Sequence, residues 1–279
     1  LKPIFNNSEI IGSSFQIPYF HVISQNKDLT FKPTLFEDSM FMVQNEFRQL
    51  NKNSSFIADF NYLKNYKSNI SKDKNSITHL FSKYFLDLNL DDYSLSTLNF
   101  SIQKVSNDTY LKVFDSNLNE MALKPGDKNN LTSSAILNLN NENFDLNTGV
   151  EIYENLGEVK NNDRYQFVFP YYDLSFSSIN FKNGLVRLDS SGNSRLINTN
   201  NLKTKIVNNL VYEKIENYTD YGFKNNFSVY FKNVNRLSKK DLKYKSSPQL
   251  ELSSIFEFNS SFPLSKIKNN NINYLIPKL

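Results

Sequence analysis

The sequence predicts an all-β fold, built as a long antiparallel sheet in which strands that follow one another in the chain are neighbours. Between Phe15 and Leu63, apolar and polar side chains alternate at every second position through three successive segments. A period of two is typical of β-strands, because successive side chains point to opposite faces of a sheet. Short polar runs at 37–39 and 51–53 separate the segments, and such runs reverse the chain direction. We therefore expect an antiparallel meander with one apolar and one polar face.

The first two expected strands, at 1–5 and 10–23, each contain a proline, Pro3 and Pro18. Proline has no amide hydrogen to donate to a neighbouring strand, so within sheets it is normally confined to edges, strand starts and bulges. Two prolines in adjacent strands predict a weakly paired place at the start of the meander. The same positional rule also allows a simpler interpretation, in which both prolines lie at strand ends or on an ordinary edge.

The alternation continues to the end of the chain, and we expect roughly 14 to 16 strands and no helix. The further expected strands lie at 29–35, 41–48, 55–62, 86–91, 97–103, 136–139, 144–152, 165–171, 179–182, 185–188, 203–212, 223–234 and 250–259. Two polar stretches without periodicity, 64–78 and the surroundings of 124–128, predict long loops. Asn183-Gly184 predicts a two-residue hairpin turn, in which both residues need a positive φ.

Composition excludes several classes of function. The net charge of +4 over 279 residues gives little support to nucleic-acid binding, and the absence of cysteine excludes a disulfide or thiolate metal site in this chain. The chain has no apolar run of about 18 residues, which excludes a transmembrane helix. The two histidines, His21 and His79, have no carboxylate or second histidine at metal-ligand spacing, and no phosphate-binding loop or nucleophile motif is present. We therefore expect no enzymatic activity, no metal and no cofactor.

Polar residues on the predicted strands are the candidates for function. If the sheet closes into a barrel, the following side chains project into a wet lumen: Glu46, Arg48, Asp59, Asn61, Asn99, Ser101 and Gln103. A barrel interior is polar in any case, so polarity alone gives none of them a specific role. Alternation also does not say what the apolar face touches, and a soluble β-sandwich or a solenoid with an apolar core stays an equal alternative.

Seven stretches of the chain form an ordered set of motifs: QIPYF at 16–20, NKDLT at 26–30, KPT at 32–34, QNEFRQL at 44–50, VSNDTYLKVFD at 105–115, RYQF at 164–167 and PYYD at 170–173. Taken in this order, they resemble the LptD family of outer-membrane lipopolysaccharide-assembly proteins. The first four resemble the second to fourth barrel strands of the family, and VSNDTYLKVFD resembles its strand-turn-strand motif. The resemblance extends over nearly the whole chain.

The resemblance implies a partial antiparallel up-and-down transmembrane β-barrel, comprising roughly the first half, or slightly more, of a large barrel. Leu1 is not a methionine and 273–279 look like an interrupted strand, so we expect a piece of a longer protein. Residues 1–279 would then form part of one barrel domain, with a periplasmic jelly-roll domain and the closing strands outside the chain. The expected location is the outer membrane of a Gram-negative bacterium.

The function that the resemblance implies is insertion of lipopolysaccharide into the outer leaflet. Its sugars would pass through the polar lumen, and its acyl chains would leave through a lateral gate at which Pro3 and Pro18 match family positions. The expected partners are lipopolysaccharide, an LptE-like plug lipoprotein and the periplasmic Lpt bridge proteins, with no nucleic acid. The alternatives are a general diffusion porin, which needs no weakened junction, and a soluble β-rich binding or adhesin domain.

Overall fold

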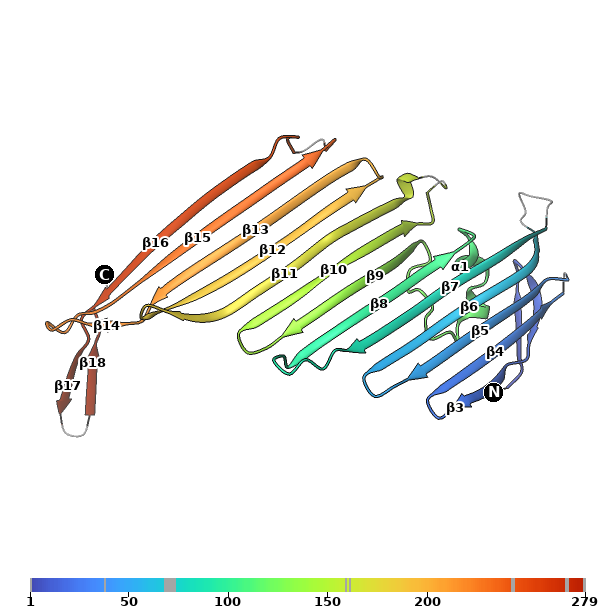
Figure 1. Cartoon of the computed structure of the whole chain (residues 1–279), viewed down its shortest axis with the longest axis horizontal. Coiled ribbons are helices and arrows are strands. Elements are labelled where there is room, and N and C mark those ends of the chain that lie inside the picture. Colours follow the sequence, from blue (N-terminus) through green and yellow to red (C-terminus); the bar gives the residue numbers. More distant parts are fainter. Residues whose placement is uncertain are drawn as a thin grey trace.

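A computed structural model describes residues 2–37, 39–67, 74–158, 160, 162–241, 244–268 and 271–277. Within these residues the protein is one broad antiparallel sheet of 16 strands and a separate hairpin of β17 (Leu264–Lys268) and β18 (Asn271–Leu275). Figure 1 shows the sheet as one twisted layer, with the blue N-terminal strands at one side and the red C-terminal strands at the other. The prediction of an all-β antiparallel fold is confirmed.

The strands pair in chain order, apart from those at the two ends of the sheet. Their bounds are β1 (Ile4–Ser8), β2 (Gly12–Gln16), β3 (Tyr19–Ser24), β4 (Lys27–Phe36), β5 (Phe41–Leu50), β6 (Ser54–Lys67), β7 (Lys74–Asp87), β8 (Leu95–Val105), β9 (Asn130–Asn140), β10 (Phe144–Asn155), β11 (Tyr165–Phe181), β12 (Gly184–Ile197), β13 (Asn201–Lys214), β14 (Asn217–Tyr218), β15 (Lys224–Lys239) and β16 (Gln249–Ser261). Beyond the chain order, β3 pairs with β4, and both β14 and β16 pair with β15.

Helical structure in the described part of the chain is short. It comprises α1 (Tyr110–Val113) and two 3-10 turns, η1 (Asp115–Leu118) and η2 (Asn162–Arg164), so the expectation of no helix is corrected. None of the described helices is long and apolar enough to cross a membrane.

The described strands form an open sheet. The last long strand, β16, pairs with β15 along one side only, and the first strands lie at the opposite end of the sheet (Figure 1). The described residues therefore do not form a closed ring of strands. Both ends of the sheet leave backbone amides and carbonyls unpaired, and such edges can pair with further strands.

The strand register separates the side chains into a polar face and an apolar face. Gln44 and Asn61 are directly opposite each other on the polar face. Phe56, Tyr84 and Phe100 follow one another across three strands on the apolar face, with ring centroids 6.4 and 6.3 Å apart. The predicted division into two faces is confirmed on these strands.

The main buried apolar cluster lies on the polar face, under the connection between β8 and β9. We call this connection, residues 106–129, the cover loop. Its α1 and η1 bury Tyr110, Phe114 and Leu118 against strand residues that include Met42 and Leu63. Burial of each such large side chain stabilises the packed state by roughly 1.5–3 kcal/mol. The cover loop is therefore packed onto the sheet.

The predicted long loop at 64–78 is wrong at both of its ends. β6 continues to Lys67 and β7 begins at Lys74, while 68–73 lie outside the described residues. A bulge between Leu63 and Tyr66, with Asn65 at a φ of 65°, shifts the register and hides the alternation in the sequence.

Three other expectations about local structure are corrected. The expected strand at 10–23 is divided into β2 and β3, and 105–115 holds the end of β8 and α1 where a second strand was expected. The two-residue hairpin turn is present, but its positive-φ residues are Lys182 and Asn183. Gly184 already belongs to β12, where it pairs with Phe181. A glycine fits at this position because a Cβ there would lie 2.5 Å from the Tyr212 ring.

Candidate functional site

The first edge of the sheet ends in a strand that is exposed along its whole length. All six residues of β3 are exposed, and within the described residues β3 pairs only with β4. β1 covers β2, from Ile4 opposite Gln16 to Ser8 opposite Gly12, and does not reach β3. An exposed strand edge is a template for pairing with another strand. We call β3 the free edge.

Prolines weaken the sheet next to the free edge. The register of β2 and β3 against β4 continues through the break at 17–18 without a slip. Ile17 donates its amide to the Pro33 carbonyl at 3.1 Å, but Pro33 has no N–H and cannot return a hydrogen bond. Because the backbone groups of successive strand residues point to opposite sides, the donor missing at Pro18 lies on the outer side of the strand. One backbone hydrogen bond is therefore missing on each side of this strand, because Pro33 of β4 lacks the donor on the inner side and Pro18 lacks the donor on the outer side.

The expected positions of the prolines inside the first two strands are corrected. Pro3 directly precedes β1, and Pro18 lies in the break between β2 and β3. Both are at strand ends, where the missing donor costs least. Pro33, which the sequence analysis did not select, lies inside β4, as Pro170 lies inside β11. The assignment of Pro3 and Pro18 to a lateral gate stays a prediction.

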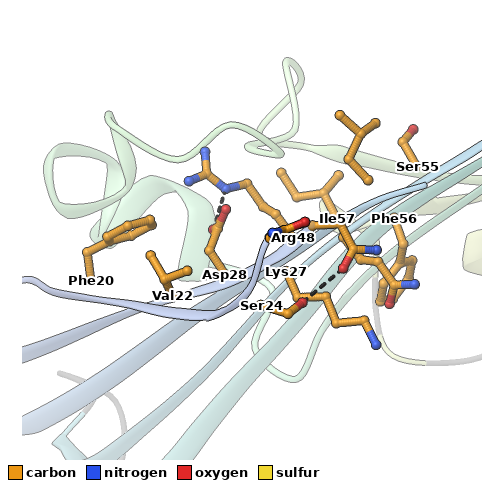
Figure 2. Close-up of a pocket in the computed structure, with 13 residues that line it drawn as sticks. Phe20, Val22, Ser24, Lys27, Asp28, Arg48, Ser55, Phe56 and Ile57 are labelled. Carbon is orange, nitrogen blue, oxygen red and sulfur yellow. Dashed lines mark hydrogen bonds and ion pairs between the residues drawn. The ribbon is translucent and has the colours of Figure 1, made fainter. Parts of the chain in front are cut away.

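A cavity of about 540 Å³ opens on the polar face beside the free edge. Figure 2 shows Phe20 and Val22 of β3 on one side of this cavity and Ile57 of β6 further along. Among them, Arg48 Nε donates to Asp28 Oδ1 at 2.8 Å, so these two charges neutralise each other, and Lys27 is a third charged residue in the wall. Apolar side chains and a paired charge suit an apolar ligand segment better than a charged one. We call this space the edge cavity.

A buried polar cluster joins the cover loop to the sheet. His79 Nε2 lies 2.6 Å from Asp59 Oδ1, and His79 Nδ1 lies 2.8 Å from the Tyr110 hydroxyl. Asn61 Nδ2 donates to the same hydroxyl at 2.9 Å, and Gln44 Nε2 donates to Asp59 Oδ2 at 2.9 Å. Each of these five residues is at most 1% exposed. The cluster therefore has no contact with solvent.

The protonation of the cluster follows from its geometry. Burial, with a smaller effect from the charge of Asp59, raises the pKa of Tyr110 well above its usual value, so the hydroxyl keeps its proton. Asn61 already donates to the hydroxyl oxygen, so the hydroxyl proton goes to His79 Nδ1, and Nε2–H donates to Asp59. Both ring nitrogens of His79 are thus occupied. Among the described residues, no group of three or more His, Cys, Asp or Glu could hold a metal ion.

The seven predicted lumen residues all lie on the polar face, but in different surroundings. Asp59 and Asn61 belong to the buried cluster under the cover loop. Glu46 is buried next to Arg48, with 3.7 Å between its Oε1 and Arg48 Nε, and Arg48 reaches the edge cavity. The half-buried members on β8 are Asn99, Ser101 and Gln103. Their role in lining a lumen stays a prediction.

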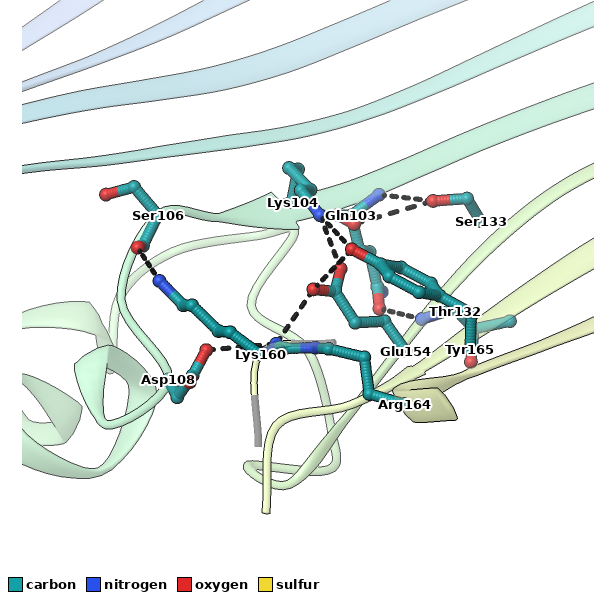
Figure 3. A network of polar contacts seen from close by, with 10 residues as sticks. All are labelled: Gln103, Lys104, Ser106, Asp108, Thr132, Ser133, Glu154, Lys160, Arg164 and Tyr165. Carbon is teal, nitrogen blue, oxygen red and sulfur yellow. Dashed lines mark hydrogen bonds and ion pairs between the residues drawn. The ribbon is translucent and has the colours of Figure 1, made fainter. Parts of the chain in front are cut away.

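Gln103 bridges a place where β8 and β9 separate. Its side-chain Oε1 accepts a hydrogen bond from the backbone N–H of Thr132 at 2.9 Å, and its backbone N–H donates to Ser133 Oγ at 3.0 Å (Figure 3). These contacts take the place of backbone bonds, because the β8–β9 pairing ends at Ser101 opposite Ser134. Gln103 therefore has a structural role at this point.

A second polar network ties the cover loop to β10 and β11 (Figure 3). Glu154 accepts hydrogen bonds from Lys104 Nζ at 2.7 Å and from the Tyr165 hydroxyl at 3.0 Å. Arg164 Nη2 lies 2.8 Å from Glu154 and 2.9 Å from Asp108 of the cover loop. The Arg164 side chain is only 3% exposed, so its charge depends on these two carboxylates.

The sequence analysis did not identify the pair that fixes the cover loop. His79 and Tyr110 are 31 positions apart, and the helix that carries Tyr110 was not expected. One signal was present: Ile77, His79 and Phe81 alternate with their neighbours, and this alternation places His79 on the same face as Asn61.

Comparison with known proteins gives partial support to one family. No protein-family model matches the sequence. The chain is similar to the LPS-assembly protein LptD of Idiomarina loihiensis, with 26% identity over 184 residues. The match takes in 66% of this chain and 22% of that protein, so the chain matches about a fifth of the length of this relative. The similarity supports the relationship to LptD that the sequence motifs indicated, at this partial level.

Proposed function

We propose that the chain is part of an outer-membrane β-barrel that inserts lipopolysaccharide into the outer leaflet. The observation that carries the proposal is the free edge, which Pro18 and Pro33 leave weakly bonded and which adjoins the apolar edge cavity. The similarity to a protein named for lipopolysaccharide assembly suggests the substrate. One support is geometric and the other comes from sequence, so they are independent of each other.

In the proposed barrel, further strands pair with the two edges of the sheet and the apolar face contacts lipid. Exposed apolar side chains are spread across that face, and they include Leu80, Phe100, Leu210, Phe231 and Phe256. A transmembrane barrel needs this alternation of lipid-facing apolar and lumen-facing polar residues. The polar face, with Glu46, Arg48, Asn99, Ser101 and Gln103, then lines the lumen.

The acyl chains and the sugars of lipopolysaccharide take different paths at the free edge. Its acyl chains enter the edge cavity at Phe20 and Val22 and leave beside β3, where few backbone hydrogen bonds hold the neighbouring strand. Its sugars stay on the polar face. Pro3 and Pro18 are gate residues in this scheme. No covalent bond changes, and the energy for transport comes from outside this chain. The proposed partners are an LptE-like plug lipoprotein and the periplasmic Lpt bridge proteins.

The alternative functions fit these features less well. A general diffusion porin needs no weakened strand edge, and its polar face stays open to solutes. Here the cover loop occupies the polar face of β5 to β8 and buries side chains such as Met42 and Leu63 there. A soluble binding or adhesin domain needs a cover for the exposed apolar side chains of the other face.

Depletion of the full-length protein tests the proposal. In cells whose single copy of the gene can be repressed, newly made lipopolysaccharide should stop reaching the surface, as measured with antibody on intact cells, while its synthesis continues. Normal surface lipopolysaccharide after depletion would contradict the proposal. A constantly open ion conductance, measured with the native plug lipoprotein present, would favour the porin. Heat-modifiable migration in detergent gels tests the barrel separately.

A further inference from the structure

A second cavity, of about 450 Å³, lies on the polar face of β10 to β12, remote in sequence from the free edge. Bulges set its place. The register of β11 against β12 shifts between Val168 and Tyr171, and the register of β10 against β11 shifts between Gly149 and Glu151. A bulge bends its strand and redirects side chains. We call this space the bulge cavity.

Two tyrosines contribute phenol rings to the bulge cavity. Tyr171 pairs with Gly149, and a Cβ on Gly149 would lie 3.1 Å from the Tyr171 hydroxyl and 2.5 Å from the Ala135 carbonyl. Only glycine leaves room for the tyrosine to extend over the neighbouring strand. Tyr153, whose hydroxyl donates to Glu151, supplies the second ring.

Four polar side chains of the bulge cavity are not used by the fold. Asp173, Arg195, Asn193 and Gln166 line it, and none of these side chains has a hydrogen bond or ion pair to another described residue. They come from two neighbouring strands, with Asn193 opposite Tyr171 in the register. Water satisfies such exposed groups until a ligand with matching donors and acceptors replaces it.

This set of groups matches the chemistry of a sugar. A carboxylate accepts hydrogen bonds from sugar hydroxyls, while a guanidinium and side-chain amides donate to them. Aromatic rings offer flat apolar surfaces on which the C–H side of a sugar ring can pack. The cavity holds charges of both signs, the Arg195 guanidinium and the carboxylates of Asp173 and Glu151, which disfavours a simple ion, and charged groups disfavour a hydrocarbon chain.

We propose that the bulge cavity binds a hydroxyl-rich saccharide, with Asp173 and Arg195 as its charged hydrogen-bonding residues. The inference rests on the proposed function, in which the saccharide is the polar part of lipopolysaccharide. The two cavities then divide the substrate between them. The edge cavity takes its acyl part beside β3, and the bulge cavity takes sugar on β10 to β12.

The test uses the full-length protein, purified with its partner lipoprotein in detergent. The probe is lipid-free core oligosaccharide, released from bacterial lipopolysaccharide by mild acid, and binding is measured by titration calorimetry. Wild type should bind saturably. Asp173→Ala and Arg195→Ala should each lower the affinity roughly tenfold, because each removes a charge-assisted hydrogen-bonding group.

Lys232→Ala is the matched control. Lys232 lies on the polar face of β15, outside the bulge cavity, and it forms no ion pair with any described residue. This variant should bind like wild type. Absence of saturable binding to wild type, or unchanged affinity in both cavity variants, would overturn the inference. Heat-modifiable migration of each variant shows that a loss of binding is not a loss of folding.

The depletion experiment separates this inference from the proposed function. Loss of surface lipopolysaccharide on depletion, without oligosaccharide binding to the purified protein, would leave the proposed function standing and overturn the saccharide site. Normal surface lipopolysaccharide would remove the proposed function. Oligosaccharide binding that Asp173→Ala and Arg195→Ala weaken would support the saccharide site in that case too.

Discussion

The polar face carries two regions of similar composition that are organised in opposite ways. Over β5 to β8, Asp59 and His79 bond to each other and to Tyr110, and the cover loop seals them from water. Over β10 to β12, Asp173 and Arg195 line a cavity, and neither side chain has a hydrogen bond or ion pair to another described residue. The first region uses its polar groups to hold the fold, whereas the second leaves its polar groups accessible.

The difference between the regions comes from the backbone and not from residue types. A long connection covers the first region, and a bulge opens the second. Asp59 and Asn61 show the consequence, because both were predicted to line a lumen and both are at most 1% exposed. A ligand in the lumen cannot touch them while the cover loop is in place. The partners of a polar side chain therefore decide its role.

The largest effect is expected from Asp59→Ala. The change leaves His79 and Gln44 with unpaired groups in a buried site, and it should lower the free energy of unfolding by about 3 kcal/mol. Trypsin should then cut the cover loop faster at Lys112 and Lys128, which are exposed and are not followed by proline, and this cleavage gives the measurement. Asp173→Ala, in the open region, is the control and should keep wild-type protection. Equal cleavage of both variants would remove the distinction between the two regions.

Gly149→Ala should affect the second region in particular. Its Cβ would lie 2.5 Å from the Ala135 carbonyl, so the strand or Tyr171 must move, at a cost of about 1–3 kcal/mol. Thermal unfolding and oligosaccharide binding measure the change. Gly126→Ala in the cover loop is the matched control, since nothing lies within 4 Å of its Cβ position. If both variants keep wild-type stability and binding, Tyr171 does not shape the cavity.

Pro33→Val tests the weakened junction at the free edge. Valine restores an amide opposite Ile17, and one added backbone hydrogen bond stabilises the pairing by about 1 kcal/mol. Surface lipopolysaccharide should fall while heat-modifiable migration is kept.

Pro18→Val should impair transport in the same way, because it restores a donor on the outer side of the strand. Normal export in both variants would count against the gate.

The smallest effect is expected from acid. Hydrogen bonds from Lys124 and Lys128 lower the pKa of Asp115 below its usual value of 3.8. Because the folded pKa is the lower one, the carboxylate stabilises the cover loop above a pH of about 4, and this contribution is lost as the pH falls through the folded pKa. Amide hydrogen exchange in the cover loop, corrected for its intrinsic pH dependence, should rise modestly. Asp115→Asn should show no such rise. A rise of equal size in that variant would mean that a group other than Asp115 causes the acid-induced increase in exchange.

The sequence predicted the strands because alternation is a local signal that survives without knowledge of contacts. It failed where the signal was interrupted, as at the bulge between Leu63 and Tyr66. The prediction from alternation also failed in the cover loop. Phe114 and Leu118 pack there on distant strands, and the short α1 and η1 have no local periodicity that predicts them.

The candidate site was predictable in the same uneven way. The missing donor at Pro18 follows from its residue type, but the sequence analysis placed Pro18 inside a strand, and it lies in the break between β2 and β3. The partners of Asp59 do not follow from such a rule, since His79 is 20 positions away and the cover loop is brought back by packing. The bulge cavity depends on the register shift between Val168 and Tyr171, and Pro170 within that shift is a bulge signal that the sequence analysis did not use.

Photo-crosslinking in living cells tests the central claim most directly. A photoreactive residue replaces Phe20, which lines the edge cavity, in the full-length protein, and adducts are detected with antibody to lipopolysaccharide. Ile179, exposed on the apolar face near the same end of the strands, is the control position. The account predicts a lipopolysaccharide adduct at Phe20 and none at Ile179. No adduct at Phe20, from protein shown to be folded in the outer membrane, would contradict it.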